Sequence, residues 1–85
     1  LADEVVPHDQ LHPRAIELAA DVARGALQAQ AITKRLIDAG LSTSLEDGLA
    51  LERAGFVEVF RTEDSQIGVR SFLDHGPGKA AFTGR

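Results

Sequence analysis

Histidines and paired carboxylates are the candidates in this chain for metal binding or for acid–base catalysis. His8 and His12 lie four residues apart, a spacing that would present two imidazoles as zinc ligands on one helical face. A zinc site needs at least one further ligand, and Pro7 and Pro13 put both histidines at a helix entrance. We therefore expect exposed histidines and no metal site.

Carboxylates occur as two neighbouring pairs, Glu46 with Asp47 and Glu63 with Asp64. Two adjacent carboxylates could serve as a general acid and a general base. Both pairs stand where helices are expected to begin, however, and acidic side chains are stabilised there by the helix dipole and by capping of free backbone N–H groups. The sequence predicts helix caps at both places and no catalytic residue in the chain.

Glu52 differs from these pairs because it lies between Leu49 and Phe56 on a predicted apolar helix face. A carboxylate in such a position needs a hydrogen-bonding or ionic partner. No histidine or activated nucleophile is expected near it. We therefore interpret Glu52 as a structural polar tie to a neighbouring helix or loop.

The composition restricts the partners of the chain. The 85 residues suffice for one domain, and a formal net charge of −4 with dispersed basic residues argues against a nucleic-acid surface. The absence of cysteine is compatible with a cytoplasmic location. No apolar run has the length of a bilayer span, so we expect no membrane association. Four phenylalanines are the only aromatic residues besides histidine, which predicts a thin core that needs a partner surface.

Hydrophobic periodicity predicts an all-α fold, a four-helix array. The expected helices span about residues 9–25, 28–39, 44–61 and 64–75. Thr43 and Glu46 fit a capping box at the start of the third helix, and Gly40 fits a left-handed residue after the second. The sequence GPG at 76–78 ends the fourth helix.

Two stretches allow more than one interpretation. Residues 1–6, LADEVV, are β-prone at their end and precede Pro7, so they fit the tail of a strand or an extended linker. Residues 36–51 have the helix, glycine-containing turn and helix of a helix-turn-helix. The second helix carries Glu46 and Asp47, which would repel phosphates, so we expect no DNA binding.

The order of several motifs resembles one known family. The motifs are GLALERAGFVEVF at 48–60, TED at 62–64, Gly68, SFLD at 71–74 and FTGR at 82–85. Together with the opening LADEVVPHDQL, this series is similar to the C-terminal helical region of the enoyl-CoA hydratase/isomerase (crotonase) superfamily. The resemblance covers essentially the whole chain.

This resemblance implies that residues 1–85 are the C-terminal oligomerisation and lid domain of a larger enzyme, with residues 1–7 as the tail of its last core strand. The enzyme would be a lyase that hydrates 2-enoyl-CoA thioesters in fatty-acid metabolism. Its catalytic ββα spiral core would be a separate part, so this segment alone would not be catalytic. The segment would contribute to the interface of a homotrimer or hexamer and to the acyl-CoA site. Acyl-CoA is the substrate, and no cofactor is expected.

Three residues are candidates for the CoA contact. In the resembled family a phenylalanine, followed three residues later by a lysine, approaches the CoA adenine and phosphate of an adjacent subunit. Phe72 matches the phenylalanine, His75 stands in place of the lysine, and Ile67 stands where a glutamate commonly precedes the glycine. Lys79, four residues on, is the substitute charge that we consider. Ordinary core packing is the alternative for Phe72.

One alternative function belongs to another class of protein. A free-standing helical interaction module without enzymatic activity would also explain a small all-α chain. It predicts that the isolated chain unfolds cooperatively, whereas a segment of a larger enzyme would depend on its partner surfaces.

Overall fold

The computed structural model describes residues 1–85 and contains four α-helices and no strand. A 3-10 turn at His8–Gln10 leads into α1 (Leu11–Ala23), α2 (Leu27–Gly40), α3 (Leu45–Val59) and α4 (Glu63–His75). The predicted all-α array is confirmed, with helix bounds close to those expected. None of the helices combines the length and the apolarity needed to traverse a bilayer.

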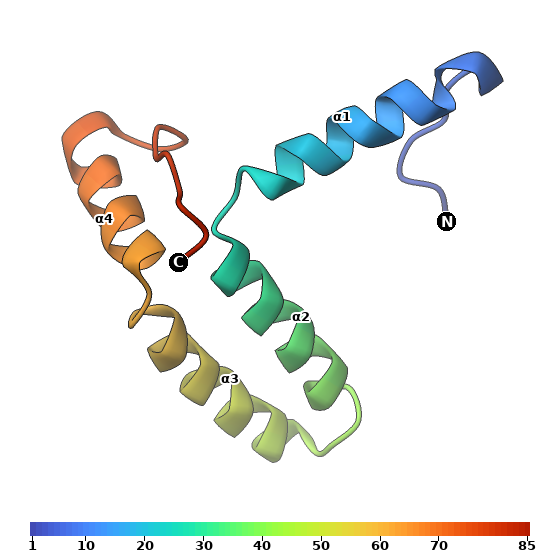
Figure 1. Cartoon of the computed structure of the whole chain (residues 1–85). Coiled ribbons are helices and arrows are strands. Elements are labelled where there is room, and N and C mark those ends of the chain that lie inside the picture. Colours follow the sequence, from blue (N-terminus) through green and yellow to red (C-terminus); the bar gives the residue numbers. More distant parts are fainter.

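The helices form an open arrangement. α2 and α3 lie side by side as an antiparallel hairpin, α1 projects away on its own, and α4 continues beyond α3 (Figure 1). The radius of gyration is 16.2 Å, whereas a compact domain of this length would have about 12 Å. Most helix faces are therefore not covered by another part of the chain.

Close contact in the hairpin depends on glycine. Gly55 of α3 is buried against Leu36 of α2, and a Cβ atom at Gly55 would collide with the Leu36 side chain. Farther along, a Cβ atom at Gly48 would lie 3.6 Å from the Gly40 backbone. Ile32 of α2 is the only buried large hydrophobic residue. The core is thus a narrow seam between two helices.

Two local predictions about helix ends are wrong. Ser44 caps α3 in place of Thr43, because its hydroxyl oxygen accepts a hydrogen bond from the Asp47 backbone N–H at 3.1 Å. Gly40 is not left-handed: it is the last residue of α2, and the Leu41 N–H continues the helical pattern to the Ile37 carbonyl at 3.0 Å. A right-handed last turn satisfies this carbonyl, so no left-handed residue is needed.

Both ends of α4 lie where the sequence predicts them. Thr62 caps α4 and accepts a hydrogen bond from the Ser65 backbone N–H at 3.1 Å. Gly76 and Gly78, with φ of +80° and +72°, end α4 and reverse the chain. Left-handed backbone favours glycine, which explains why both positions lack a side chain.

Residues 1–7 form neither a helix nor a strand. The Arg14 guanidinium donates a hydrogen bond to the Glu4 carboxylate at 2.8 Å, which brings this segment back toward α1. This hydrogen bond lowers the pKa of Glu4 below its ordinary value. A strand needs a neighbouring strand, so the assignment of residues 1–7 to a core strand stays a prediction.

The exposed surface is large for so small a chain. The accessible area is 7045 Å², which exceeds by about 2,100 Å² the roughly 4,900 Å² of a compact monomer of this mass. Only Ile32, Gly55 and Asp64 are buried. Eighteen large hydrophobic residues are exposed, so the predicted thin core is confirmed.

Candidate functional site

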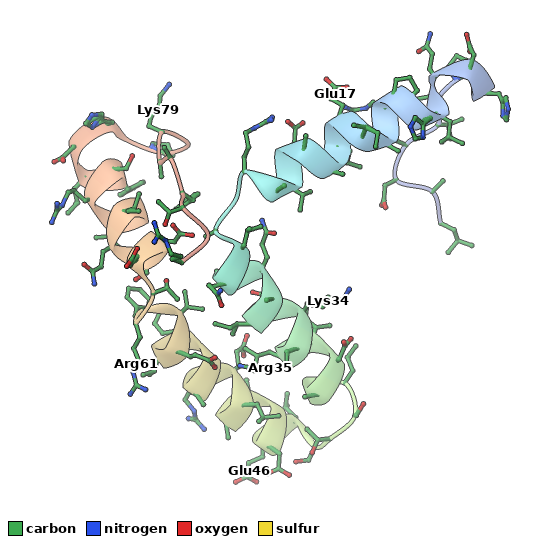
Figure 2. The ribbon with its side chains drawn as sticks, viewed as in Figure 1. Glu17, Lys34, Arg35, Glu46, Arg61 and Lys79 are labelled. Atoms are coloured by element: carbon green, nitrogen blue, oxygen red, sulfur yellow. The ribbon has the colours of Figure 1, made fainter.

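The three predicted CoA-contact residues gather where α4 ends and the chain turns back. Phe72 lies in the last turn of α4 and is 60% exposed. His75 is the last residue of the helix, and Lys79 follows the Gly76 and Gly78 turn and projects outward from it (Figure 2). Phe72 is therefore not buried in the core of this chain, and its ring is accessible.

Lys79 lines two shallow depressions on the two sides of this turn. One, of about 340 Å³, is also lined by Phe72 and Phe82. The other, of about 480 Å³, is also lined by His75 and Arg70. Phe72 and His75 thus line different depressions, and Lys79 lines both of them. An exposed aromatic ring beside basic side chains suits a ligand that carries a planar base and phosphate groups.

Sequence reasoning missed Arg70. It lies on α4 five residues before His75 and borders the same depression. Helical spacing alone did not identify Arg70 as a candidate, because the turn after α4 determines which side chains lie beside Lys79. With Arg70, three basic side chains border this depression, together with the carboxylates of Glu63 and Asp74.

Asp64 is the most deeply buried side chain, with 1% of its surface exposed. Its Oδ1 accepts hydrogen bonds from the Thr83 backbone N–H at 2.6 Å and from the Thr83 hydroxyl at 3.1 Å. Its Oδ2 accepts one from the Gly84 backbone N–H at 2.8 Å. The Asp64 N–H in turn donates to the Arg85 carbonyl at 2.8 Å. We call this set of four hydrogen bonds the Asp64 clasp.

The Asp64 clasp favours the ionised form of its carboxylate. Burial alone would raise the pKa of the Asp64 carboxyl, but the hydrogen bonds from Thr83 and Gly84 outweigh burial and leave this pKa below its ordinary value. A folded-state pKa below the unfolded one adds stability above the unfolded pKa. This stability is lost as the pH falls through the lowered pKa.

Asp64 was expected to be part of a helix cap, together with Glu63. Thr62 performs the capping instead, so both carboxylate oxygens of Asp64 are free for the C-terminal tail, residues 79–85. The partners lie 19 and 20 residues farther along the chain. No local pattern in the sequence signals a contact across that separation.

Glu52 lies on a groove between α2 and α3. The groove has a volume of about 420 Å³ and is mostly apolar, with Leu36, Leu45, Leu49 and Phe56 among its lining residues. Glu52 is the only charged residue that lines it, and it makes no hydrogen bond or ion pair within the chain. The predicted polar tie from Glu52 to a neighbouring helix or loop is thus not formed within the chain, and it stays a prediction.

The remaining candidates do not converge. His8 and His12 are exposed, and no group of three or more potential metal-ligating side chains lies together. Glu46 and Asp47 are exposed in the first turn of α3, as expected for acidic residues at a helix start. The candidate site therefore consists of the surface around Lys79 and the Asp64 clasp behind it.

Comparison with known proteins identifies the relatives of the chain. The family model "Enoyl-CoA hydratase/isomerase" matches residues 1–85. A probable enoyl-CoA hydratase of Rhizobium meliloti is 33% identical over 73 residues, covering 86% of this chain and 28% of that protein. A probable enoyl-CoA hydratase, echA8, of Mycobacterium tuberculosis is 31% identical over 74 residues, covering 87% of this chain and 29% of that protein.

A probable mitochondrial enoyl-CoA hydratase of Dictyostelium discoideum is 28% identical over 74 residues, covering 87% of this chain and 27% of that protein. The chain thus spans less than a third of the length of the curated relatives that it matches. The match of the family model extends over all four helices and the C-terminal tail. The chain belongs to the enoyl-CoA hydratase/isomerase family.

Proposed function

We propose that residues 1–85 are the C-terminal helical part of an enoyl-CoA hydratase-like enzyme, a lyase that adds water to 2-enoyl-CoA thioesters in fatty-acid metabolism. The observation that carries this proposal is the family match over the whole chain. We infer that the catalytic groups lie in a core outside these residues, because the chain spans less than a third of the length of its curated relatives. We call the protein that contains this segment and its core the assembled enzyme.

The exposed apolar surface supports a role at subunit interfaces. The excess area of about 2,100 Å² is larger than the roughly 800 Å² that each partner buries in a standard interface. The partners we propose are the catalytic core of the same chain and neighbouring subunits of a homotrimer or hexamer. A free-standing interaction module would need a core of its own, and only three residues here are buried.

The surface around Lys79 supports a role in acyl-CoA binding. Phe72 offers a ring for stacking on the adenine, and Lys79 offers a cation to a CoA phosphate. His75 borders the same region but lines only one of the two depressions. Acyl-CoA is the substrate and no cofactor is invoked. We propose a cytoplasmic location, although the Dictyostelium relative is named as mitochondrial.

Steady-state hydration of crotonyl-CoA by the assembled enzyme tests this proposal. Lys79→Ala and Phe72→Ala are each expected to raise KM about fivefold, because an exposed charge or stacking contact contributes about 1 kcal/mol of binding free energy. The value of kcat is expected to change less than twofold, because neither side chain reaches the reacting atoms.

Lys34→Ala is the matched control for this test. Lys34 is an exposed lysine of α2, far from the turn that carries Lys79 (Figure 2). Its KM is expected to equal that of the unchanged enzyme. Equal KM values for Lys79→Ala, Phe72→Ala and Lys34→Ala would remove the CoA contact from this surface. An assembled enzyme that does not hydrate crotonyl-CoA would contradict the proposed reaction.

A further inference from the structure

We propose that Asp64 is a positioning residue, which holds the C-terminal tail so that Lys79 is presented to the CoA phosphate. This inference rests on the proposed function, because it assigns Asp64 a task in the same acyl-CoA site. Asp64 does not line the depressions around Lys79. It acts through the backbone of residues 79–85.

The tail is held by hydrogen bonds at both ends, and between them only the Phe82 ring packs against α4. At the near end, the Gly76 N–H donates to the Phe72 carbonyl at 2.9 Å, and the left-handed Gly76 and Gly78 reverse the chain. At the far end, the Asp64 clasp binds residues 83–85. Residues 79–82 make no backbone hydrogen bond between these ends. The direction of Lys79 therefore depends on the two ends.

Only at the far end do hydrogen bonds to a side chain, the Asp64 carboxylate, hold the tail. Phe82 touches α4 at Gly68, where a Cβ atom would come within 3.3 Å of the Phe82 ring. Gln28 of α2 adds a hydrogen bond of 3.4 Å to the Gly84 carbonyl, so the tail also reaches the start of α2. Figure 1 shows the C-terminus between the starts of α2 and α4. Arg85 adds an ion pair of 3.8 Å to Glu63, and the Asp64 carboxylate accepts three of the hydrogen bonds that hold the tail.

A carboxylate is the group that fits this position. Two backbone N–H groups, from Thr83 and Gly84, each point at a different oxygen of Asp64. An asparagine has one acceptor oxygen, and its NH₂ group would face the second donor. An alanine would leave both N–H groups without their partner, so the tail would detach and expose them to water.

Two measurements on the assembled enzyme test the positioning role. The first is the rate of trypsin cleavage after Lys79, followed by mass spectrometry. Lys79 is exposed already, but the clasp restrains residues 83–85, and a detached tail can enter the protease in the extended form that cleavage requires. The second is KM for crotonyl-CoA. Asp64→Ala is expected to accelerate this cleavage at least tenfold, because protease access follows the population of the open segment. It is also expected to raise KM about fivefold, no more than Lys79→Ala does.

Graded variants and a control accompany Asp64→Ala. Asp64→Asn is near-isosteric and is expected to give smaller changes in both measurements. Thr83→Val removes only the hydroxyl contact, keeps both backbone donors and is expected to give the smallest change. Asp38→Asn makes the same chemical change at an exposed carboxylate that accepts no hydrogen bond, and it is expected to leave both measurements unchanged.

A double substitution separates positioning from a general structural role. If Asp64 acts through Lys79, adding Asp64→Ala to Lys79→Ala raises KM no further, because the positioned group is already absent. A further increase in KM in the double variant would overturn the positioning role. Unchanged cleavage after Lys79 in Asp64→Ala would overturn the clasp itself.

Failure of the proposed function would look different. In that case Lys79→Ala alone would leave KM unchanged, and the positioning role of Asp64 would be overturned with it. Cleavage after Lys79 needs no acyl-CoA, so it would still decide whether Asp64 holds the tail.

Discussion

Replacing Gly55 with leucine is expected to drive α2 and α3 apart and to destabilise the assembled enzyme by about 3 kcal/mol, the upper end of the usual cost of overpacking. Gly55 is buried, and even a Cβ atom there collides with Leu36. A leucine adds three more carbon atoms to a seam that has no space for them. The free energy of unfolding in urea, compared with that of the unchanged enzyme, measures this effect.

Two alanine variants make the Gly55 test specific. Gly55→Ala brings its Cβ against the Cδ1, Cδ2 and Cγ atoms of Leu36, so this side chain must move, and the higher helix propensity of alanine offsets about 1 kcal/mol of the cost. Its net effect is therefore expected to be smaller than that of Gly55→Leu. Gly40→Ala has no atom within 4 Å of the new Cβ and is expected to leave stability unchanged or raised. If Gly55→Leu were as stable as Gly55→Ala, the close approach of α2 and α3 would be wrong.

Replacing both Leu49 and Phe56 with arginine is expected to dissociate the assembled enzyme into its subunits. Leu49 is 47% and Phe56 65% exposed in this chain, so the change would cost little in a free-standing module. In an interface, both arginines would be taken from water into an apolar contact. Glu52 in the same groove can pair with one of them, and the other would stay unpaired at a cost of several kcal/mol. Sedimentation velocity measures the mass of the assembly directly.

Asp38→Arg is the control for this dissociation. Asp38 is exposed near the end of α2, where a positive charge is favourable for the helix dipole. The assembly is expected to keep its mass in this variant. A double arginine variant of Leu49 and Phe56 that also keeps its mass would show that the α2 and α3 groove is not an interface between subunits.

The sequence predicted what depends on neighbours along the chain. Helix periodicity and capping residues located all four helices, and the glycines at 76 and 78 located the end of α4. The choice between Thr43 and Ser44 as the cap could not be made, because each hydroxyl has an acidic residue three positions later. The backbone direction entering α3 decides between them, and that direction is a tertiary property.

Only the part of the candidate site that depends on neighbours along the chain was predicted from the sequence. Phe72 and His75 are three residues apart on one helix, so their proximity follows from helix geometry. Lys79 lies beyond a turn, so its place beside both depended on the left-handed glycines. The Asp64 clasp joins residues 19 and 20 positions apart, and nothing local distinguishes Asp64 from a capping residue. The family was predicted from the order of motifs and is confirmed.

Hydrogen exchange of the assembled enzyme, measured with and without coenzyme A, tests both the proposed interface and the proposed acyl-CoA site. The amides of α2 and α3 are expected to exchange slowly in both states, because partner surfaces cover them. The amides of residues 72–79 are expected to slow at least severalfold when coenzyme A is added, because binding orders the turn that carries Lys79. If saturating coenzyme A left exchange at residues 72–79 unchanged, the acyl-CoA site would be contradicted. If the amides throughout α2 and α3 exchanged fast, the interface would be contradicted.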